Sequence, residues 1–166
     1  MKKIFALLFM TSILFTSCSN DDDTDFDTIG STFEITATFN AGNDYRIEAV
    51  VPNNIDVFDS DVALVYVLDP IQSNAAQADV WEPLPRTFFF DGGGFAQFQF
   101  NFIFDAQQNI ASIDIFLESD DLAALAPDIT DNQDFRIVIV PSSFAEDAKV
   151  DLKDFNAVQK ALKLEY

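Results

Sequence analysis

The sequence predicts an all-β fold, an antiparallel β-sandwich that begins at residue 31 and ends in a short helix. Hydrophobic residues make up 49% of the 166 residues, so the chain can bury a full core. From residue 31 onward apolar and polar residues alternate in short stretches, which is the period of a strand with one buried face. Turn-forming residues separate these stretches at the spacing of hairpin connections.

The first strands are expected at residues 32–39 (TFEITATF) and 45–51 (YRIEAVV), joined by a turn at residues 41–44 (AGND). One face of the first strand is apolar throughout and consists of Phe33, Ile35, Ala37 and Phe39. Residues 61–68 (DVALVYVL) are apolar on both faces, so they are expected to lie inside a sheet.

A hairpin is expected next, with strands at residues 86–90 and 95–104 around a glycine-rich turn at residues 91–94 (DGGG). This spacing does not match the dinucleotide-binding pattern G-x-G-x-x-G. The second strand places aromatic rings on one face, namely Phe98, Phe100, Phe102 and Phe104. Alternating aromatic residues usually pack in a core, and a hydrophobic ligand pocket is the functional alternative. Because residues 95–104 carry no charge and no proline, they are also an aggregation-prone segment when unfolded.

The last strands are expected at residues 110–117 and 135–140, where Pro141 ends the pattern. Ser119 is expected to cap a short helical turn that reaches Leu125 and ends at Pro127. Asp151 is expected to cap a longer C-terminal helix, whose apolar stripe consists of Leu152, Phe155, Val158 and Leu162. About seven strands result, in a sandwich that is immunoglobulin-like in outline, with a barrel as the alternative.

The N-terminal region predicts export. Lys2 and Lys3 precede a largely apolar stretch of twelve residues at positions 4–15, shorter than the roughly 20 residues that span a bilayer. Thr16 and Ser17 then lead to Cys18, the only cysteine. We therefore divide the chain into a signal peptide (residues 1–17), an acidic tether (residues 18–30) and one β-sandwich domain (residues 31–166).

The segment around Cys18 resembles the lipobox of bacterial lipoproteins, although Phe15 stands where that motif usually has leucine. The resemblance implies cleavage before Cys18 and attachment of fatty acyl chains such as palmitate, which would anchor the protein in a membrane. Two or more chains hold a protein stably, whereas one holds it only marginally. A free or buried thiol at Cys18 is the alternative interpretation.

An acidic run, Asp21, Asp22 and Asp23, follows the cysteine closely. It resembles the surface-export signal of lipoproteins from Bacteroidetes, which implies a location on the outer face of the outer membrane. An ordinary solvated tether, extended by charge repulsion, is the alternative. The stretches DSDVALVYVL, VWEPLPRTFFFDGG, DFRIVIVPSSFA and DFNAVQKALKLEY resemble small lipoproteins of Flavobacteria. No activity is established for that family, so the resemblance implies location rather than mechanism.

Composition excludes several function classes. The chain has no histidine, which excludes Ser-His-Asp hydrolysis, Cys-His proteolysis and histidine-bound zinc sites. Without the signal peptide, seven basic residues face 28 acidic ones, a formal charge of −21. Such a surface repels nucleic acid, whereas divalent cations and basic partners are electrostatically allowed. No cofactor motif is present, and we predict no catalytic or cofactor-binding residues.

Two acidic loops are candidates for calcium, which prefers six to eight oxygen ligands. One contains Asn53, Asn54, Asp56, Asp59 and Asp61, and the other contains Asp128, Asp131, Asn132 and Asp134. Neither has a complete ligand spacing, so they would have to meet, and loop solvation with turn hydrogen bonds is the favoured interpretation. We therefore predict no metal site.

Trp81 is the only tryptophan and lies between prolines and strands in VWEPLP. It is the candidate ligand contact, as a platform for a sugar or a peptide, and an anchor in the core or at a sheet edge is the alternative. The favoured function is a non-catalytic surface module that binds protein or glycan. A structural envelope component facing the periplasm is the main alternative, followed by a carboxylate- or metal-dependent enzyme.

Overall fold

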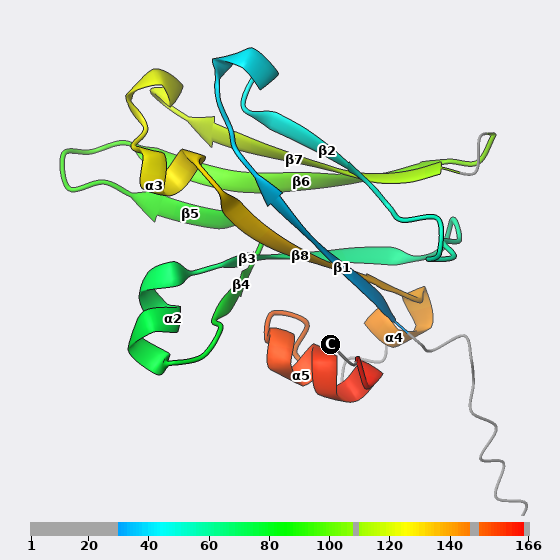
Figure 1. Cartoon of the computed structure of the whole chain (residues 1–166). Coiled ribbons are helices and arrows are strands. Elements are labelled where there is room, and N and C mark those ends of the chain that lie inside the picture. The colour runs from blue at the N-terminus through cyan, green and yellow to red at the C-terminus, as the bar shows by residue number, and fades with distance from the viewer. Residues whose placement is uncertain (1–29, 108–109, 147–149, 165–166) are drawn as a thin grey trace, which may run out of the picture.

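The computed structural model describes residues 30–107, 110–146 and 150–164. Eight strands in this part of the chain form two four-stranded antiparallel sheets, which confirms the predicted β-sandwich (Figure 1). Sheet A has the order β1 (Ser31–Ala37), β8 (Gln133–Val140), β3 (Val62–Leu68) and β4 (Trp81–Pro83). Sheet B has the order β2 (Arg46–Val50), β7 (Ile110–Ser119), β6 (Phe95–Asp105) and β5 (Arg86–Phe89).

The sandwich has two ends that differ in their connections. At the proximal end, as we call it, β1 begins beside the end of β8, and β3 also begins there, with Ser31 opposite Ile139 and Val62 opposite Val140. Residues 51–61 join β2 to β3 at this end. The distal end, as we call the other, carries the turn at residues 91–94 and the connection from β7 to β8. Gly30, the last residue of the predicted tether, precedes β1 at the proximal end.

The inward faces of the two sheets form the core. Three fully buried aromatic rings meet at its centre, with Phe98 lying 5.2 Å from Phe39 and 5.4 Å from Phe135 between ring centroids. Isoleucines from both sheets surround them, namely Ile113, Ile115, Ile137 and Ile139. The aromatic face predicted for β6 thus packs inward, while Gln97, Gln99 and Asn101 lie on the opposite face.

The predicted strands are all present, and β4 is an additional one. The glycine-rich turn is also confirmed, because Gly93 and Gly94 have φ angles of 87° and 90°, which glycine adopts without strain. The Phe90 amide donates to the Gly94 carbonyl at 3.3 Å and closes the hairpin. Three residues in β4 are too few for a period-two pattern to be recognised in the sequence.

The helix predictions were wrong in several details. Ser119 does not cap a helix but ends β7, where its hydroxyl donates to the Phe95 carbonyl at 2.7 Å. Asp121 instead caps a short 3₁₀ turn, η3 (Leu122–Ala124). Pro127 begins the helical turn α3 (Pro127–Thr130) rather than ending one, since proline fits the first helical position.

The C-terminal helix, α5 (Phe155–Leu162), exists but begins later than predicted. Asp154, not Asp151, is its N-cap and accepts from the Ala157 amide at 3.2 Å. Asp151 forms a turn, accepting from the Lys153 amide at 3.0 Å. Three other helices were not predicted as such, namely the 3₁₀ turn η2 (Ala41–Asn43), α2 (Pro70–Ala76) and α4 (Ser142–Glu146).

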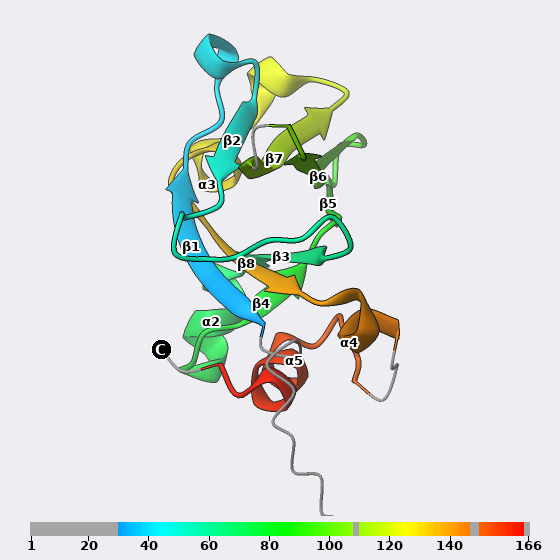
Figure 2. The same ribbon diagram turned by 90° about the vertical axis from the view of Figure 1, so that its right-hand side faces the viewer.

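Helix α5 packs on the outer face of sheet A, below that sheet in Figure 2. Its residues Phe155, Val158 and Leu162 are buried against Val138 and Val140 of β8 and Tyr66 of β3. The Tyr66 hydroxyl donates to the Leu152 carbonyl at 2.7 Å, which fixes the segment before the helix. The sandwich therefore has one outer face that is covered by a helix of its own chain.

Candidate functional site

The predicted lipidation and export residues, Cys18, Asp21, Asp22 and Asp23, lie outside the described residues. The described chain begins at Gly30, which is buried against α5. A Cβ atom at Gly30 would lie 2.5 Å from the Leu162 side chain, so the chain enters β1 in close contact with this helix. No helix in the described part of the chain is long and apolar enough to cross a membrane.

The predicted ligand contact, Trp81, lies on β4 at the outer face of sheet A. Its ring is half-buried, with the Arg136 guanidinium 4.0 Å from the ring centroid and Phe155 at 6.2 Å. Arg136 also pairs with Glu34 on the neighbouring strand. A sugar could not stack on the ring face that Arg136 occupies, so Trp81 is placed as an anchor between sheet A and α5.

The two acidic loops predicted as calcium candidates lie at opposite ends of the sandwich. Asp61 precedes β3 at the proximal end, while Asp131 precedes β8 at the distal end. Eight residues of β8 separate these ends, about 26 Å at the usual rise of a strand. Asp61 accepts from the Phe58 amide at 2.9 Å, which is a turn hydrogen bond. In the described residues no three acidic or thiol groups gather closely enough to hold a metal ion.

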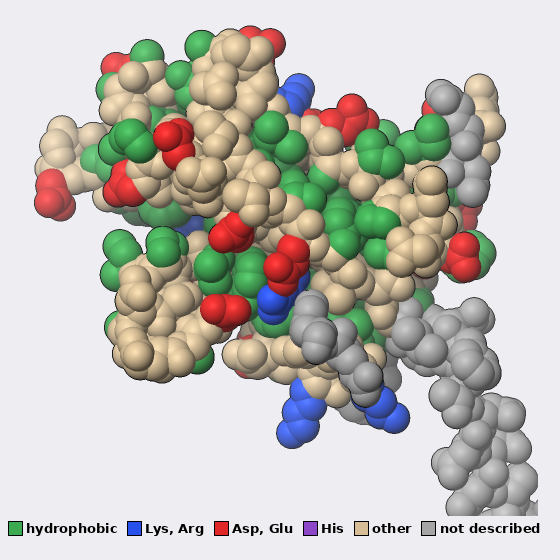
Figure 3. Space-filling model, in the orientation of Figure 1, with side chains coloured by type: hydrophobic (Ala, Val, Ile, Leu, Met, Phe, Trp, Pro, Cys, Tyr) green, Lys and Arg blue, Asp and Glu red, His purple; other side chains and the backbone are tan. Residues whose placement is uncertain are grey.

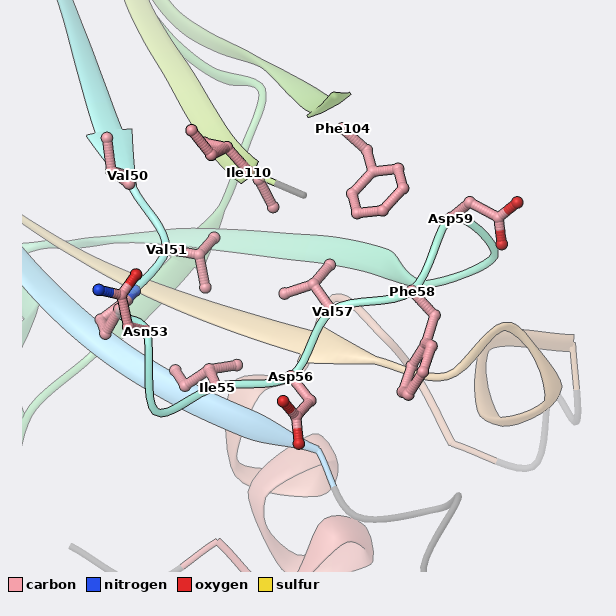
Figure 4. Close-up of a pocket in the computed structure, with 12 residues that line it drawn as sticks. Val50, Val51, Asn53, Ile55, Asp56, Val57, Phe58, Asp59, Phe104 and Ile110 are labelled. Atoms are coloured by element: carbon pink, nitrogen blue, oxygen red, sulfur yellow. The ribbon is translucent and has the colours of Figure 1, made fainter. Parts of the chain in front are cut away.

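A cavity of about 480 Å³ lies at the proximal end, a size within the roughly 300–1,000 Å³ of ligand pockets. Residues 51–53 and 55–59 line it together with the ends of β2, β6 and β7. Figure 4 shows Val51, Val57 and Phe104 pointing toward one another across this space, while Asp56 and Asp59 point away from it. The cavity therefore combines apolar side chains with polar groups of the loop in its lining, and the carboxylates of Asp56 and Asp59 turn outward.

A smaller hollow of about 160 Å³ opens beside the chain crossing from sheet A to sheet B. Ala63 and Val65 of β3 line it from one sheet and Phe100 of β6 lines it from the other. Leu84, in the crossing itself, and Lys153, just before α5, complete its wall. Both hollows thus share strand β6 as a wall.

The outer face of sheet B carries a ladder of polar side chains. On this face Asp114 of β7 is almost fully buried between Arg46, whose Nε lies 2.9 Å away, and Asn101, whose amide donates at 3.3 Å. Gln99 donates to Glu118, and Gln97 donates to the Thr87 hydroxyl at 2.5 Å. Amides and carboxylates in such rows can bind hydroxyl groups or a polypeptide backbone.

Exposed apolar side chains flank this polar ladder at both ends. Phe89 is 83% exposed and lies directly opposite Phe95 at the distal end of the sheet. At the proximal end three aliphatic side chains are exposed, namely Val50, Ile103 and Ile110. Figure 3 shows acidic side chains scattered over one face of the molecule and few basic ones. The surface of sheet B therefore combines apolar, amide and acidic groups.

Sequence reasoning missed the proximal cavity, although a signal was present. Ile55 and Val57 are apolar residues within a loop that we interpreted only through its carboxylate and amide side chains. In the structure Ile55 and Val57 pack against the core. No family model, curated protein or solved structure matches the chain.

Proposed function

We propose that this chain is a non-catalytic lipoprotein, anchored in the outer membrane through Cys18, whose β-sandwich binds a protein or a glycan at the cell surface. The observation that carries the binding role is the difference between the two outer faces. The chain's own helix α5 covers sheet A, whereas sheet B exposes Phe89, Val50 and Ile103 around a polar ladder.

The N-terminal sequence supports the location. The apolar stretch before Cys18 and the acids at positions 21–23 are the features of an anchored and exported lipoprotein. The described chain begins β1 at the proximal end, so the distal loops lie at the end of the domain farther from Ser31. The absence of histidine supports the non-catalytic role, because the most common general base is missing.

Protease treatment of intact cells tests the location. We expect digestion of the wild-type protein and protection of a variant with Asp21→Ala, Asp22→Ala and Asp23→Ala. Membrane fractionation of Cys18→Ala provides the control for anchoring, because this variant should leave the membrane fraction. Protection of the wild type would instead assign the domain to the periplasm and favour a structural role in the envelope.

A glycan array probed with the full-length protein tests the binding role and locates it. If sheet B binds the glycan, Gln99→Ala should remove the signal while Trp81→Ala retains it. If only Trp81→Ala loses the signal, the glycan-binding site lies on sheet A instead. Without any glycan signal, the protein-binding form of the proposal remains, and it is tested separately below.

A further inference from the structure

Strand β6 has a partner along its whole length on one side only. It spans Phe95–Asp105, and β7 pairs with it from Ala96 to Asp105. Its other neighbour, β5, pairs only with Phe95–Phe98, so β5 lies beside one end of β6 (Figure 1). We call the side of residues 99–104 that faces away from β7 the open edge, since no strand of the described chain pairs with it. Such an edge presents backbone groups that can pair with another chain.

The burial of the aromatic stripe changes beside the first residue of β5, Arg86. Phe98, beside β5, is fully buried, whereas Phe100, Phe102 and Phe104 are only partly buried. The opposite sheet is open on the same side, because β4 pairs with β3 only from Tyr66 to Leu68. Inward-facing rings are thus left incompletely covered between the two sheets, and an added strand would cover them.

The two hollows lie along this row of rings. Phe100 lines the hollow of about 160 Å³ and Phe104 lines the cavity of about 480 Å³. Four residues separate them, about 13 Å along a strand. Side chains at positions i, i+2 and i+4 of an extended peptide point to the same face with this spacing. One peptide strand beside β6 could therefore place an apolar side chain in each hollow.

Charge selects the kind of occupant. Residues 99–104 carry no charge, but Asp56 and Asp59 border the larger cavity. The chain has a formal charge of −19, so a second copy would be repelled. A segment with Lys or Arg between its apolar residues would be attracted by this negative charge, and those basic residues would lie on the outer side of the added strand, away from the hollows.

We propose that the open edge of β6 accepts an extended segment of a basic protein partner as an additional β-strand. Its apolar residues at positions i and i+4 fill the two hollows, and its backbone pairs with residues 99–104. This inference rests on the binding role proposed above and names the partner class and the place of contact. Strand addition of this kind combines backbone hydrogen bonds for affinity with pockets for specificity.

A displayed library of random heptapeptides, selected against the full-length protein in detergent micelles, tests the proposal. Selected peptides should carry apolar residues at alternate positions, with Lys or Arg between them. Each is then resynthesised in two forms, N-methylated at one or the other set of alternate amides. Only one set faces β6, so one form should bind at least roughly tenfold more weakly and the other should bind as before. The protein is unchanged in this comparison, so misfolding cannot produce the result.

A matched pair of protein variants places the peptide. Phe104→Ala should weaken peptide binding by roughly tenfold, whereas Ile71→Ala, a truncation at a 79% exposed side chain on α2, should have no effect. Thermal melts of both variants confirm that they are folded.

Several outcomes would overturn the proposal. These are a library without enrichment, equal effects of the two methylated forms, or equal effects of Phe104→Ala and Ile71→Ala. Peptide binding that appears only after removal of residues 19–29 would assign the edge to the chain's own tether. If the protein forms dimers that the selected peptides dissociate, the open edge would instead bind a second copy of this chain. None of these outcomes alters the protease result on intact cells, so failure here is distinguishable from failure of the proposed location.

Discussion

Replacing Phe98 by alanine should destabilise the domain more than almost any other single substitution. The ring is 0% exposed and lies 5.2, 5.4 and 6.1 Å from the rings of Phe39, Phe135 and Phe88. Truncating a buried Phe to Ala costs about 3–5 kcal/mol, since it removes apolar contact and leaves a cavity. A domain of this size has about 5–15 kcal/mol in total, so the variant should approach the limit of folding.

Urea unfolding followed by Trp81 fluorescence measures this loss. The indole lies between sheet A and α5, away from Phe98, so it reports unfolding rather than the local change. A thermal melt followed by the same fluorescence is the second measurement. At about 2–4 °C per kcal/mol, it should show the melting temperature of Phe98→Ala lowered by about 10 °C.

The matched control is Phe89→Ala in the same hairpin, at a ring that is 83% exposed. This change should alter the free energy of unfolding by no more than about 0.5 kcal/mol. An equal loss in both variants would refute the assignment of inner and outer faces. A shift of one residue in the register of β5 and β6 reverses every side chain between core and solvent.

Three further predictions concern the C-terminal segment, the hairpin turn and metal binding. Tyr66→Phe removes the 2.7 Å hydrogen bond to the Leu152 carbonyl, so it should cost about 1–3 kcal/mol in urea unfolding and increase proteolysis of the C-terminal segment. Gly94→Ala places a Cβ 2.7 Å from the Asp120 carboxylate at a φ of +90°, and should lower the melting temperature, whereas Gly92→Ala, with open space around it, should not. A millimolar calcium titration should leave the melting temperature unchanged, because the two acidic loops lie at opposite ends of the sandwich.

The strands were predictable because the period-two pattern is local and each sandwich strand has a buried face. Helices were harder to predict because their ends depend on single capping residues. Asp69 followed by Pro70 is a helix-start signal that the sequence contained, and Asp69 does accept from the Ile71 and Gln72 amides at 2.9 Å. Asp151 and Asp154 are acids three residues apart, and either could be the N-cap of the C-terminal helix from sequence alone. In the structure Asp154 is the N-cap, and Phe155, which follows it, is buried.

The candidate surfaces were less predictable because they depend on contacts between distant segments. The aromatic alternation of β6 was visible in the sequence, but its partial exposure depends on where β5 begins. Likewise, Trp81 looks like an exposed platform in the sequence, and only its pairing with Arg136, 55 residues later in the chain, shows one ring face to be covered.

The two prolines around Leu84 connect the fold to the proposed binding edge. Pro83 ends β4 and Pro85 precedes β5, and the chain changes from sheet A to sheet B between them. Proline has no backbone N–H to donate, so β5 can extend its ladder toward residues 99–104 only poorly. The same Pro-Leu-Pro segment that lets one chain serve both sheets therefore leaves the side of β6 that faces away from β7 without a strand of the described chain over residues 99–104.

An open edge with uncharged aromatic residues is a hazard as well as an opportunity. Natural proteins usually protect such edges with charged or proline residues, and residues 99–104 contain neither. A formal charge of −19 keeps copies of this chain apart without blocking the edge itself. Protection by long-range repulsion discriminates by the charge of the incoming chain, whereas a lysine in the strand would exclude every partner alike. This combination is what a surface built to receive a basic strand requires.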